Sequence, residues 1–208
     1  MNSAQSKPKD RYHHGALREA LVSASRSIVV ESGAGALSLR AVARRLGVSH
    51  AAPGHHFPDK RALLAAVAAQ GFHDLEQAMT RAANESEPDP LSRLRATGVA
   101  YVRFAADNPE LFRLMVGREL LTGDSDELRS AAEAAFQVLV REARATLSAR
   151  GESSEERLKL VTTTAWSLVH GLSMLWLDGR LRGTRTPDAL EALARQVTEL
   201  VGTIVEAR

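Results

Sequence analysis

Three proline residues, each preceded by a residue that can cap a helix, are the strongest constraint on the fold of this chain. The pairs are Asp89-Pro90, Asn108-Pro109 and Thr186-Pro187. Proline suits the first position of a helix, because its fixed φ is already helical and its missing N–H has no intrahelical acceptor there. The pairs predict helices over about 90–107, 109–121 and 187–206.

Apolar residues recur at helical spacing in the rest of the chain as well. One such stripe predicts a helix over about 14–32 that stops at Gly33 and consists of Leu17, Leu21, Ala24 and Ile28. Comparable patterns predict a short helix behind Ser38, a long one after Lys60, and helices near 124–149 and 154–178. Strictly alternating apolar runs are scarce, and 44% of the residues are hydrophobic. The sequence therefore predicts an all-α protein of about nine helices.

The composition excludes several kinds of site. The sequence has no cysteine, which removes disulfides, thiolate nucleophiles and iron–sulfur ligation. No apolar stretch approaches the roughly 18 residues that span a bilayer. The polar start MNSAQSKPKDRYHHG also lacks the apolar segment of a signal peptide. We therefore expect a cytoplasmic protein without a membrane partner.

Positive charge is concentrated in the first third of the chain. Residues 1–61 hold ten Lys or Arg against four Asp or Glu, together with five of the seven histidines. Residues 62–208 hold 17 bases against 21 acids, so the net charge of +2 combines a basic part with an acidic part. This asymmetry favours a polyanionic partner for the first part, although a solvated basic surface explains it equally well.

Motifs for catalysis and metal binding are incomplete. The G-x-G of SGAGALS lies at a helix end rather than after a strand, and GLSML has Leu175 where a G-x-S-x-G elbow needs its last glycine. The histidine pairs 13–14 and 55–56 have no carboxylate at ligand spacing. We expect no enzymatic activity, no metal and no cofactor.

The stretch from Ser38 to Lys60 fits a helix-turn-helix, in which a short helix and a glycine-containing turn precede a second short helix. The second helix of such a module enters the major groove of DNA with its N-terminal end. Ser49 is expected to cap this recognition helix and to leave the following N–H groups free for a phosphate or a base edge. His50 is the candidate for hydrogen bonds to bases.

Other residues of the module are expected to support this contact. Ala51 and Ala52 let the backbone approach the DNA and can touch thymine methyl groups. Phosphate contacts are predicted for Arg11, Arg40, His55, His56 and Lys60.

The segment SLRAVARRLGVSHAAPGHHFPDKRALLAAVA, residues 38–68, resembles the DNA-binding domain of the tetracycline-repressor (TetR) family. The positions that match its pattern are Ser38, Ala43, Gly47, Val48, Ser49, His56, Phe57, Lys60, Leu63 and Leu64. Within AWSLVHGLSMLW, Trp166, His170 and Gly171 resemble the Trp-x-x-x-His-Gly signature of one branch of that family. The resemblance adds Ser38 to the DNA-binding candidates.

By this resemblance, the chain is a homodimeric transcriptional regulator that binds an operator in double-stranded DNA. Such a regulator is usually a repressor that a small molecule releases, here expected to be an apolar effector. An activator or a constitutive DNA-binding regulator is the alternative. A small helical ligand-binding module or enzyme is a weaker one, because no nucleophile–base pair, metal set or phosphate loop is found.

One departure from the family pattern concerns Gly54, which stands where the family commonly has a tyrosine that holds a phosphate. Pro53 also removes the N–H that would bond the carbonyl of Ser49, and Gly54 costs about 1 kcal/mol in helix propensity relative to Ala. We therefore predict a recognition helix of about two turns, partly 3₁₀ at its end. Packing of Phe57 and Leu46 is expected to hold it, with the Gly54 backbone close to a phosphate.

The ligand-binding candidates are aromatic, methionine and histidine residues of the C-terminal part. They are Tyr101, Phe104, Phe112, Met115, Phe136, Trp166, His170 and Met174. An apolar wall with one or two polar groups is typical of an effector pocket, and His170 is the expected polar group. Core packing explains the same residues.

The last two predicted helices each carry more apolar surface than one buried face requires. The first has one stripe of Leu158, Val161, Thr162, Ala165, Val169, Leu172 and Trp176, and a second of Leu160, Thr163, Ser167, His170 and Met174. The other has a stripe of Leu190, Leu193, Val197, Leu200 and Ile204, broadened by Ala194 and Val201. A four-helix homodimer interface and an intrachain bundle core both fit this pattern.

The acidic segment NESEPDP, residues 84–90, interrupts the helical pattern and marks a boundary. We expect four parts along the chain. They are a flexible basic arm over 1–12, a DNA-binding domain over 13–60, a connecting helix over 61–83, and a ligand-binding and dimerisation domain over 84–208.

Overall fold

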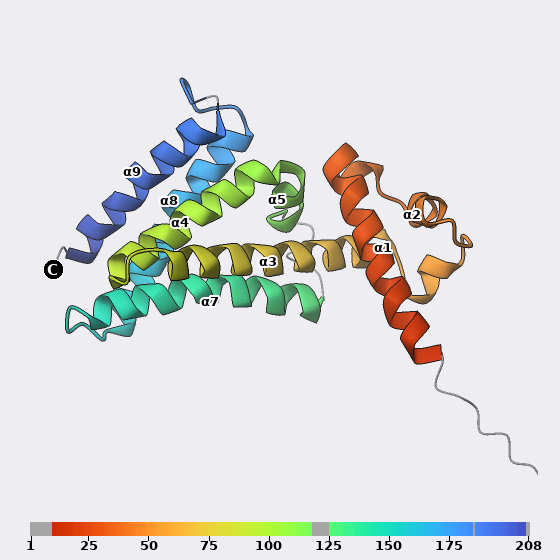
Figure 1. Ribbon diagram of the computed structural model, residues 1–208, viewed down its shortest axis with the longest axis horizontal. Coiled ribbons are helices and arrows are strands. Elements are labelled where there is room, and N and C mark those ends of the chain that lie inside the picture. Colours follow the sequence, from red (N-terminus) through yellow and green to blue (C-terminus); the bar gives the residue numbers. More distant parts are fainter. Residues whose placement is uncertain (1–9, 118–124, 185, 207–208) are drawn as a thin grey trace, which may run out of the picture.

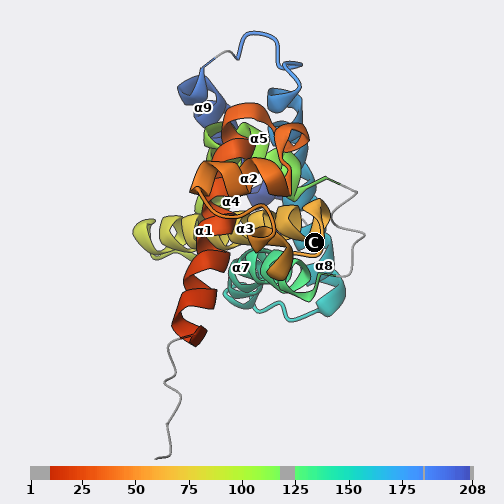
Figure 2. The ribbon, with the colours of Figure 1, turned by 90° about the vertical axis from the view of Figure 1, so that its right-hand side faces the viewer.

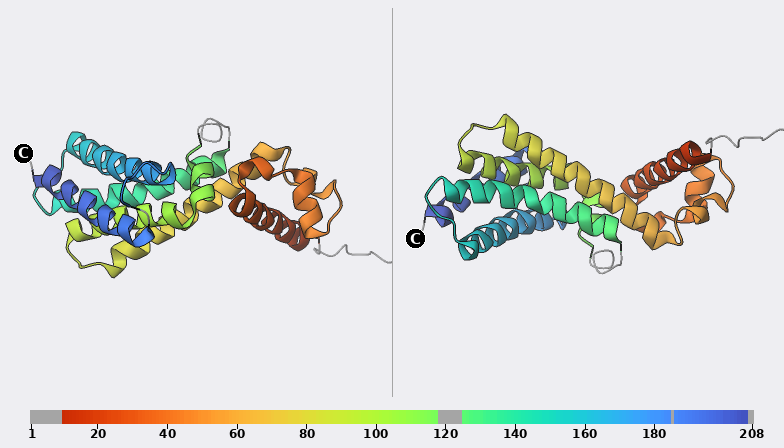
Figure 3. Two further views of the ribbon diagram at one scale, coloured as in Figure 1. Left: turned by 90° about the horizontal axis from the view of Figure 1, so that it is seen from above. Right: turned by 90° about the horizontal axis from the view of Figure 1, so that it is seen from below.

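The computed structural model describes residues 10–117, 125–184 and 186–206, with side chains for 16–117, 125–184 and 186–205. These residues form eight α-helices and two 3₁₀ turns without a strand, which confirms the all-α prediction. A small module and a larger helical body make up the molecule, and one long helix extends from the first into the second (Figures 1 and 3).

The N-terminal module is built from short elements around the beginning of the long helix. In chain order they are α1 (Asp10–Ser32), η1 (Ala34–Ala36), α2 (Leu39–Leu46), η2 (Ala52–His55) and the first turns of α3 (Lys60–Glu85). Gly33 ends α1 and Gly47 ends α2, both with the positive φ that favours glycine. Figure 2 views the molecule from this end, with α1 and α2 in front of the C-terminal body.

The C-terminal body consists of the rest of α3 and five further helices. These are α4 (Pro90–Asp107), α5 (Pro109–Met115), α7 (Asp126–Ser148), α8 (Glu155–Leu177) and α9 (Pro187–Glu206). The helix α4 is central, because it contacts α3, α7, α8 and α9. The short α5 contacts both α1 and α3, so it lies at the junction with the module.

The three proline pairs begin helices as predicted, with one difference in chemistry. Asp89 caps α4 by accepting a hydrogen bond from the backbone N–H of Ser92. Asn108 does not cap α5, because its side-chain amide donates to the carbonyl of Phe104 in the preceding helix. The helix α5 ends at Met115 rather than near 121, and the last positions of the predicted helix lie outside the described residues.

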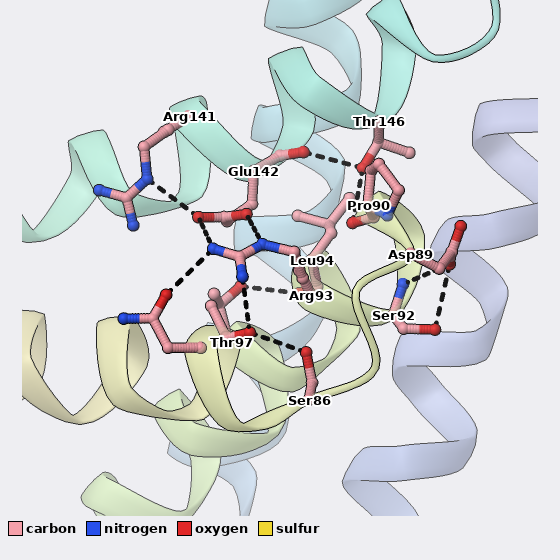
Figure 4. Close-up of polar contacts among 12 residues, drawn as sticks. Ser86, Asp89, Pro90, Ser92, Arg93, Leu94, Thr97, Arg141, Glu142 and Thr146 are labelled. Carbon is pink, nitrogen blue, oxygen red and sulfur yellow. Dashed lines mark hydrogen bonds and ion pairs between the residues drawn. The ribbon is translucent and has the colours of Figure 1, made fainter.

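A buried carboxylate fixes α7 to the ends of α3 and α4 (Figure 4). Glu142, on α7, is 2% exposed and accepts hydrogen bonds from Arg93 and Arg141. Burial alone raises the pKa of Glu142, but the hydrogen bonds and charges of the two arginines outweigh it and hold the pKa below its ordinary value. Thr146 donates to the carbonyl of Pro90 one turn further along α7. Polar contacts therefore connect α3, α4 and α7 at this end of the body.

The last two helices expose part of their apolar surface. The first predicted stripe of α8 is buried, except for Trp176, which is half-buried. In the second predicted stripe, Leu160 is 51% exposed. In α9 the buried residues are Leu190, Ala194, Thr198, Val201, Gly202 and Val205. The predicted stripe is thus divided, because Leu200 is 52% exposed and Leu193, Val197 and Ile204 are half-buried.

Contrary to the sequence expectation, α8 has the length and apolar composition of a membrane-spanning helix, with a mean hydropathy of 1.2 over an 18-residue window. It alone among the described helices has them. A third of that window is buried inside the molecule, where α8 packs against α4, α7 and α9. The core helix of a soluble protein has the same property.

Candidate functional site

The predicted recognition helix is shorter than expected. Residues 52–55 form one 3₁₀ turn, and the segment before it, from Val48 to Ala51, is not helical. The carbonyl of Ser49 accepts from the N–H of Ala52, three residues on, because Pro53 at the fourth position has no N–H. The prediction of two turns was therefore wrong, whereas the predicted 3₁₀ character is found. Ser49 is not the helix cap, since Ala51 holds that position without a side-chain bond.

Packing rather than regular hydrogen bonding holds this segment. Phe57 is 3% exposed, Pro53 is buried, and Leu46 packs against the same core. The guanidinium carbon of Arg18 lies 5.4 Å from the centroid of the Phe57 ring, within the range of a cation–π contact. The predicted support by Phe57 and Leu46 is confirmed, and Arg18 adds to it from α1.

The predicted DNA-binding residues whose side chains the structure describes lie at the surface of the module, fully or partly exposed. Ser38, Arg40, Ser49, His50, Ala51, Gly54 and His55 are exposed, and Ala52, His56 and Lys60 are half-buried. The side chain of Arg11 lies outside the described residues, although its backbone belongs to α1. Among the described residues, the N–H groups of Ser49, His50 and Ala51 have no acceptor. Three consecutive backbone N–H groups before η2 are therefore available to a ligand.

Several polar groups of the module serve its own structure. Ser38 caps α2 by accepting from the N–H of Ala41 at 3.1 Å. Lys60 donates to the carbonyl of Gly35 at 3.0 Å and so ties the start of α3 to η1. Arg45 forms two hydrogen bonds with Glu31, which join the ends of α1 and α2. Some of the Lys and Arg residues among the first 61 positions therefore form contacts within the module itself.

The C-terminal body contains a cavity of about 680 Å³ between α3, α4, α7, α8 and α9. Its lining is mostly apolar and includes Phe72, Leu75, Met79, Leu94, Val116, Leu128, Phe136, Leu139, Val169 and Val201. The charged side chains in the lining are Arg95, Arg129 and Glu133. This volume falls within the range of small-molecule sites, about 300–1,000 Å³.

Four predicted ligand-binding residues line the cavity and form a chain of ring contacts. Phe136 and Trp166 are 5.9 Å apart between centroids, and Trp166 and His170 are 5.8 Å apart. The hydroxyl oxygen of Tyr101 lies 2.9 Å from Nδ1 of His170. Burial raises the pKa of Tyr101 to about 12 and lowers the pKa of His170 below its ordinary value. Both groups are therefore held neutral at physiological pH.

The other four predicted ligand-binding residues do not line the cavity. Phe112 and Met115 are fully buried on α5, where Met115 packs over Gly71 of α3. Phe104 is buried one turn beyond Tyr101, and Met174 is half-buried against the core. Phe112 still contacts a cavity-lining residue, because its ring centroid lies 5.5 Å from that of Tyr101. These four residues pack in or against the hydrophobic core, which was the alternative explanation for them.

Sequence reasoning missed two arginines. Arg95 lines the cavity from α4, and Arg18 links the module to the body through Glu127 at 2.6 Å. The position of Arg95 beside the stripe of Leu94 and Tyr101 was the available signal, but it does not distinguish a cavity residue from a solvated one. No local pattern indicates the pair of Arg18 and Glu127, which are 109 positions apart.

Two family profiles match the chain. Bacterial regulatory proteins of the tetR family match residues 21–67, and the tetracyclin repressor-like C-terminal domain matches residues 94–200. The chain therefore belongs to the tetracycline-repressor (TetR) family. It is a transcriptional regulator with an N-terminal DNA-binding domain and a C-terminal ligand-binding domain, and effector-responsive repression is typical of this family.

Solved structures have the same architecture. A protein of unknown function from Rhodococcus sp. RHA1 is 34% identical, with a TM-score of 0.75 over 91% of this chain and 97% of that one. A tetR-family regulatory protein from Rhodococcus RHA1 is 24% identical, with a TM-score of 0.64 over 90% and 96%. FadR from Bacillus subtilis, solved in complex with stearoyl-CoA, is 15% identical, with a TM-score of 0.66 over 88% and 96%. No curated protein matches the chain.

Proposed function

We propose that this regulator is a homodimeric repressor that leaves its operator when a small molecule fills the cavity of its C-terminal domain. The observation that carries the proposal is the cavity of about 680 Å³, whose lining includes residues of α3, the helix that begins in the DNA-binding module, and of α7, whose Glu127 pairs with Arg18 of that module. The same fold is found in FadR from Bacillus subtilis, which was solved in complex with stearoyl-CoA. We place the protein in the cytoplasm, where its operator is accessible.

On the DNA side, the segment from Ser49 to His55 is the proposed major-groove element. The free N–H groups at its start suit a phosphate or a base edge, and exposed His50 is the proposed base-reading residue. Arg40 and His55 are exposed on the same module and suit phosphate contacts. Lys60 contributes through its hold on Gly35 and through its charge.

The homodimer is proposed to form through α8 and α9. A single chain leaves Leu160, Leu175 and Leu200 between 44% and 52% exposed on these two helices. Large exposed apolar side chains on neighbouring helices are typical of an interface, and pairing two copies creates a four-helix bundle. Such a dimer places two recognition segments on one DNA, and half-sites one turn apart need a separation of roughly 34–36 Å.

Communication between cavity and DNA is proposed to pass through the first turn of α7. Ser125, Leu128 and Arg129 line the cavity, while Glu127 in the same turn pairs with Arg18. Arg18 in turn covers Phe57, directly after the recognition segment. An effector that displaces this turn therefore acts on the support of the DNA-binding surface, provided that it binds one arrangement better than the other.

Footprinting of the purified protein on its own upstream region, with and without a panel of apolar small molecules, tests the proposal. We expect a protected site of two half-sites and loss of protection with at least one compound. Protection that every compound leaves intact would indicate a constitutive regulator. Absence of protection on any DNA would refute the proposal.

A further inference from the structure

We propose that Arg95 is the anion-binding residue of the cavity, so that the effector is an amphipathic organic anion with an apolar body and one oxyanion group. The inference rests on the proposed function, because it assumes that the cavity is the effector site. It replaces a purely apolar effector with a defined chemical class.

Arg95 is a half-buried cationic side chain in the mostly apolar lining of the cavity. It extends from α4 into the cavity lining, and its Nε is shut off from solvent without a hydrogen-bond acceptor. No carboxylate among the described residues forms an ion pair with it. The two Nη groups also have no hydrogen bond to a described residue, and because Nε itself has no accessible surface, a bound oxyanion would accept hydrogen bonds from the Nη groups.

Arg93, two residues earlier on the same helix, forms hydrogen bonds through all three nitrogens of its guanidinium group. Its Nε lies 2.9 Å from Glu142, Nη1 donates to the carbonyl of Ala83 at 3.0 Å, and Nη2 donates to Asn84 at 3.2 Å (Figure 4). Arg93 therefore has an acceptor for each of its nitrogens, whereas Arg95 has none among the described residues. The difference identifies Arg95 as a binding group rather than a structural one.

The neighbouring charged groups leave this role to Arg95. Asp89 is near enough for the charge of Arg95 to contribute slightly to its lowered pKa, but its carboxylate is occupied in capping α4 at Ser92. Arg129, the other cavity arginine, already pairs with Asp126 on its own helix. Glu133, an acidic residue at the α7 side of the cavity, accepts a hydrogen bond from the side-chain amide of Gln137. An anion is thus attracted to the α4 side.

Packing against α9 holds the guanidinium of Arg95 in place. A Cβ atom added at Gly202 would lie 2.5 Å from Nη2 of Arg95, so the absence of a side chain at Gly202 makes room for this group. The planar guanidinium can then offer two parallel N–H groups to one carboxylate or phosphate, which an ammonium cannot do.

The rest of the cavity suits the apolar body of such a molecule. Tyr101 lies six residues after Arg95 on α4, or about 9 Å along the helix. Between and around them the lining is apolar, with Leu94, Val169 and Val201. The neutral pair of Tyr101 and His170 can receive one further polar group, but it supplies no charge that would compete for the anion.

Binding experiments with a matched panel test the inference. The probes are octanoate, decanoate, dodecanoate, naphthoate and phenylbutyrate, each with its neutral alcohol or methyl ester and, for the decyl chain, with decyl phosphate. Binding to the full-length protein is followed through its tryptophan fluorescence, which comes from Trp176 and from Trp166 in the cavity lining. We expect at least one anion to bind about 10- to 100-fold more tightly than its neutral counterpart, as for a charge-assisted hydrogen bond in a buried site. Decyl phosphate distinguishes a carboxylate site from a phosphate site.

Variants of Arg95 connect the preference with this side chain. Arg95→Met and Arg95→Gln are expected to bind the anion about 10- to 100-fold more weakly and the neutral counterpart unchanged or more tightly. Arg95→Lys is expected to fall between them, because it keeps the charge and loses the planar pair of donors. Arg103→Gln is the matched control, since it removes an ion-paired arginine of the same helix that does not line the cavity, and we expect anion binding within about twofold of the wild type.

The outcomes separate this inference from the proposed function. If neutral compounds bind as tightly as anions and still release DNA, the inference is wrong and the proposed function stands. If anions bind through Arg95 and the operator stays protected, the anion-binding role of Arg95 stands and effector-controlled repression is wrong. If no anion of the panel binds, or if Arg95→Met binds anions like the wild type, the inference is overturned.

Discussion

Arg18 of α1 and Glu127 of α7 form an ion pair of 2.6 Å across the junction between the two domains. Their side chains are 41% and 50% exposed, so the pair contributes little to overall stability, about 0–1 kcal/mol. Its position is more informative than its strength. Glu127 shares a helical turn with cavity-lining Ser125, and Arg18 lies over the ring of Phe57.

We expect Glu127→Gln to weaken the coupling between effector and operator. The variant keeps the shape of the side chain and loses the charge that holds Arg18, so the effector-induced drop in operator affinity should shrink by about twofold to tenfold. Operator affinity is measured by fluorescence anisotropy with and without effector. Glu155→Gln is the matched control, because it removes the partner of Arg144 at the far end of α7. Equal coupling in all three proteins would contradict the proposed path.

Gly54→Ala is expected to separate protein stability from DNA binding. Gly54 has no positive φ, and a Cβ added there meets nothing within 4 Å, so alanine should stabilise the free protein by about 0.4–1 kcal/mol. If the Gly54 backbone approaches a phosphate, the same methyl group should weaken operator binding several-fold, and Gly54→Tyr should weaken it further. Thermal unfolding and salt titrations of operator binding measure the two effects. Tighter binding by Gly54→Tyr would instead mean that a missing phosphate contact was restored.

Operator binding is expected to become tighter as the pH falls from about 8 to about 6. His50, His55 and His56 lie in or beside the recognition segment, and imidazoles gain positive charge over this interval. Additional charge near phosphates raises affinity and steepens the salt dependence. The triple substitution of these histidines by Gln should flatten the pH profile of binding. A wild-type profile that is already flat would exclude the histidines from the phosphate contacts.

The stability of the C-terminal domain should decrease with acid through His170. Burial lowers the folded-state pKa of His170 below the ordinary value of 6.5, so the unfolded chain binds the proton more readily. The stabilisation is therefore present above about pH 6.5 and is lost as the pH falls toward the folded-state pKa. Urea unfolding at several pH values and fixed protein concentration measures it. His170→Gln should lose less stability with acid than the wild type, whereas the exposed control His73→Gln should behave like the wild type.

Gly98→Ala is expected to destabilise the contact of α4 with α8 and α9. A Cβ at Gly98 would lie 2.7 Å from Cγ2 of Thr198 and 3.2 Å from Cγ1 of Val169, and neither short, branched side chain can move far. Overpacking of this kind costs about 1–3 kcal/mol. Because Gly98 also lines the cavity, ligand binding should weaken as well. Gly171→Ala, where an added Cβ meets nothing within 4 Å, is the control, and equal unfolding midpoints for both variants would contradict this expectation.

The local part of the fold was predictable from the sequence. Helix starts at Pro90 and Pro187, and ends at Gly33 and Gly47, depend on backbone chemistry within a few residues, and the structure has them where the sequence predicts them. The recognition segment was predicted in part. Pro53 correctly indicated 3₁₀ structure, but the missing N–H removed more of the helix than two predicted turns allowed.

The positions of the helices relative to one another were not predictable, because they depend on contacts between distant residues. Tyr101 and Met115 have the same apolar character in the sequence, yet only Tyr101 lines the cavity, since α5 turns Met115 toward Gly71. Arg93 and Arg95 differ even more. They are two positions apart on one helix, which places their side chains about 200° apart. One side chain meets Glu142, and the other meets the cavity.

The sequence alone thus determined the helical class, most of the helix ends, the family and the region that faces DNA. The tertiary structure decided which polar groups have partners and which remain available to a ligand. The physical reason is the range of the interactions involved. Capping and helix propensity act within one turn, whereas the burial of a charge depends on what the rest of the chain places against it.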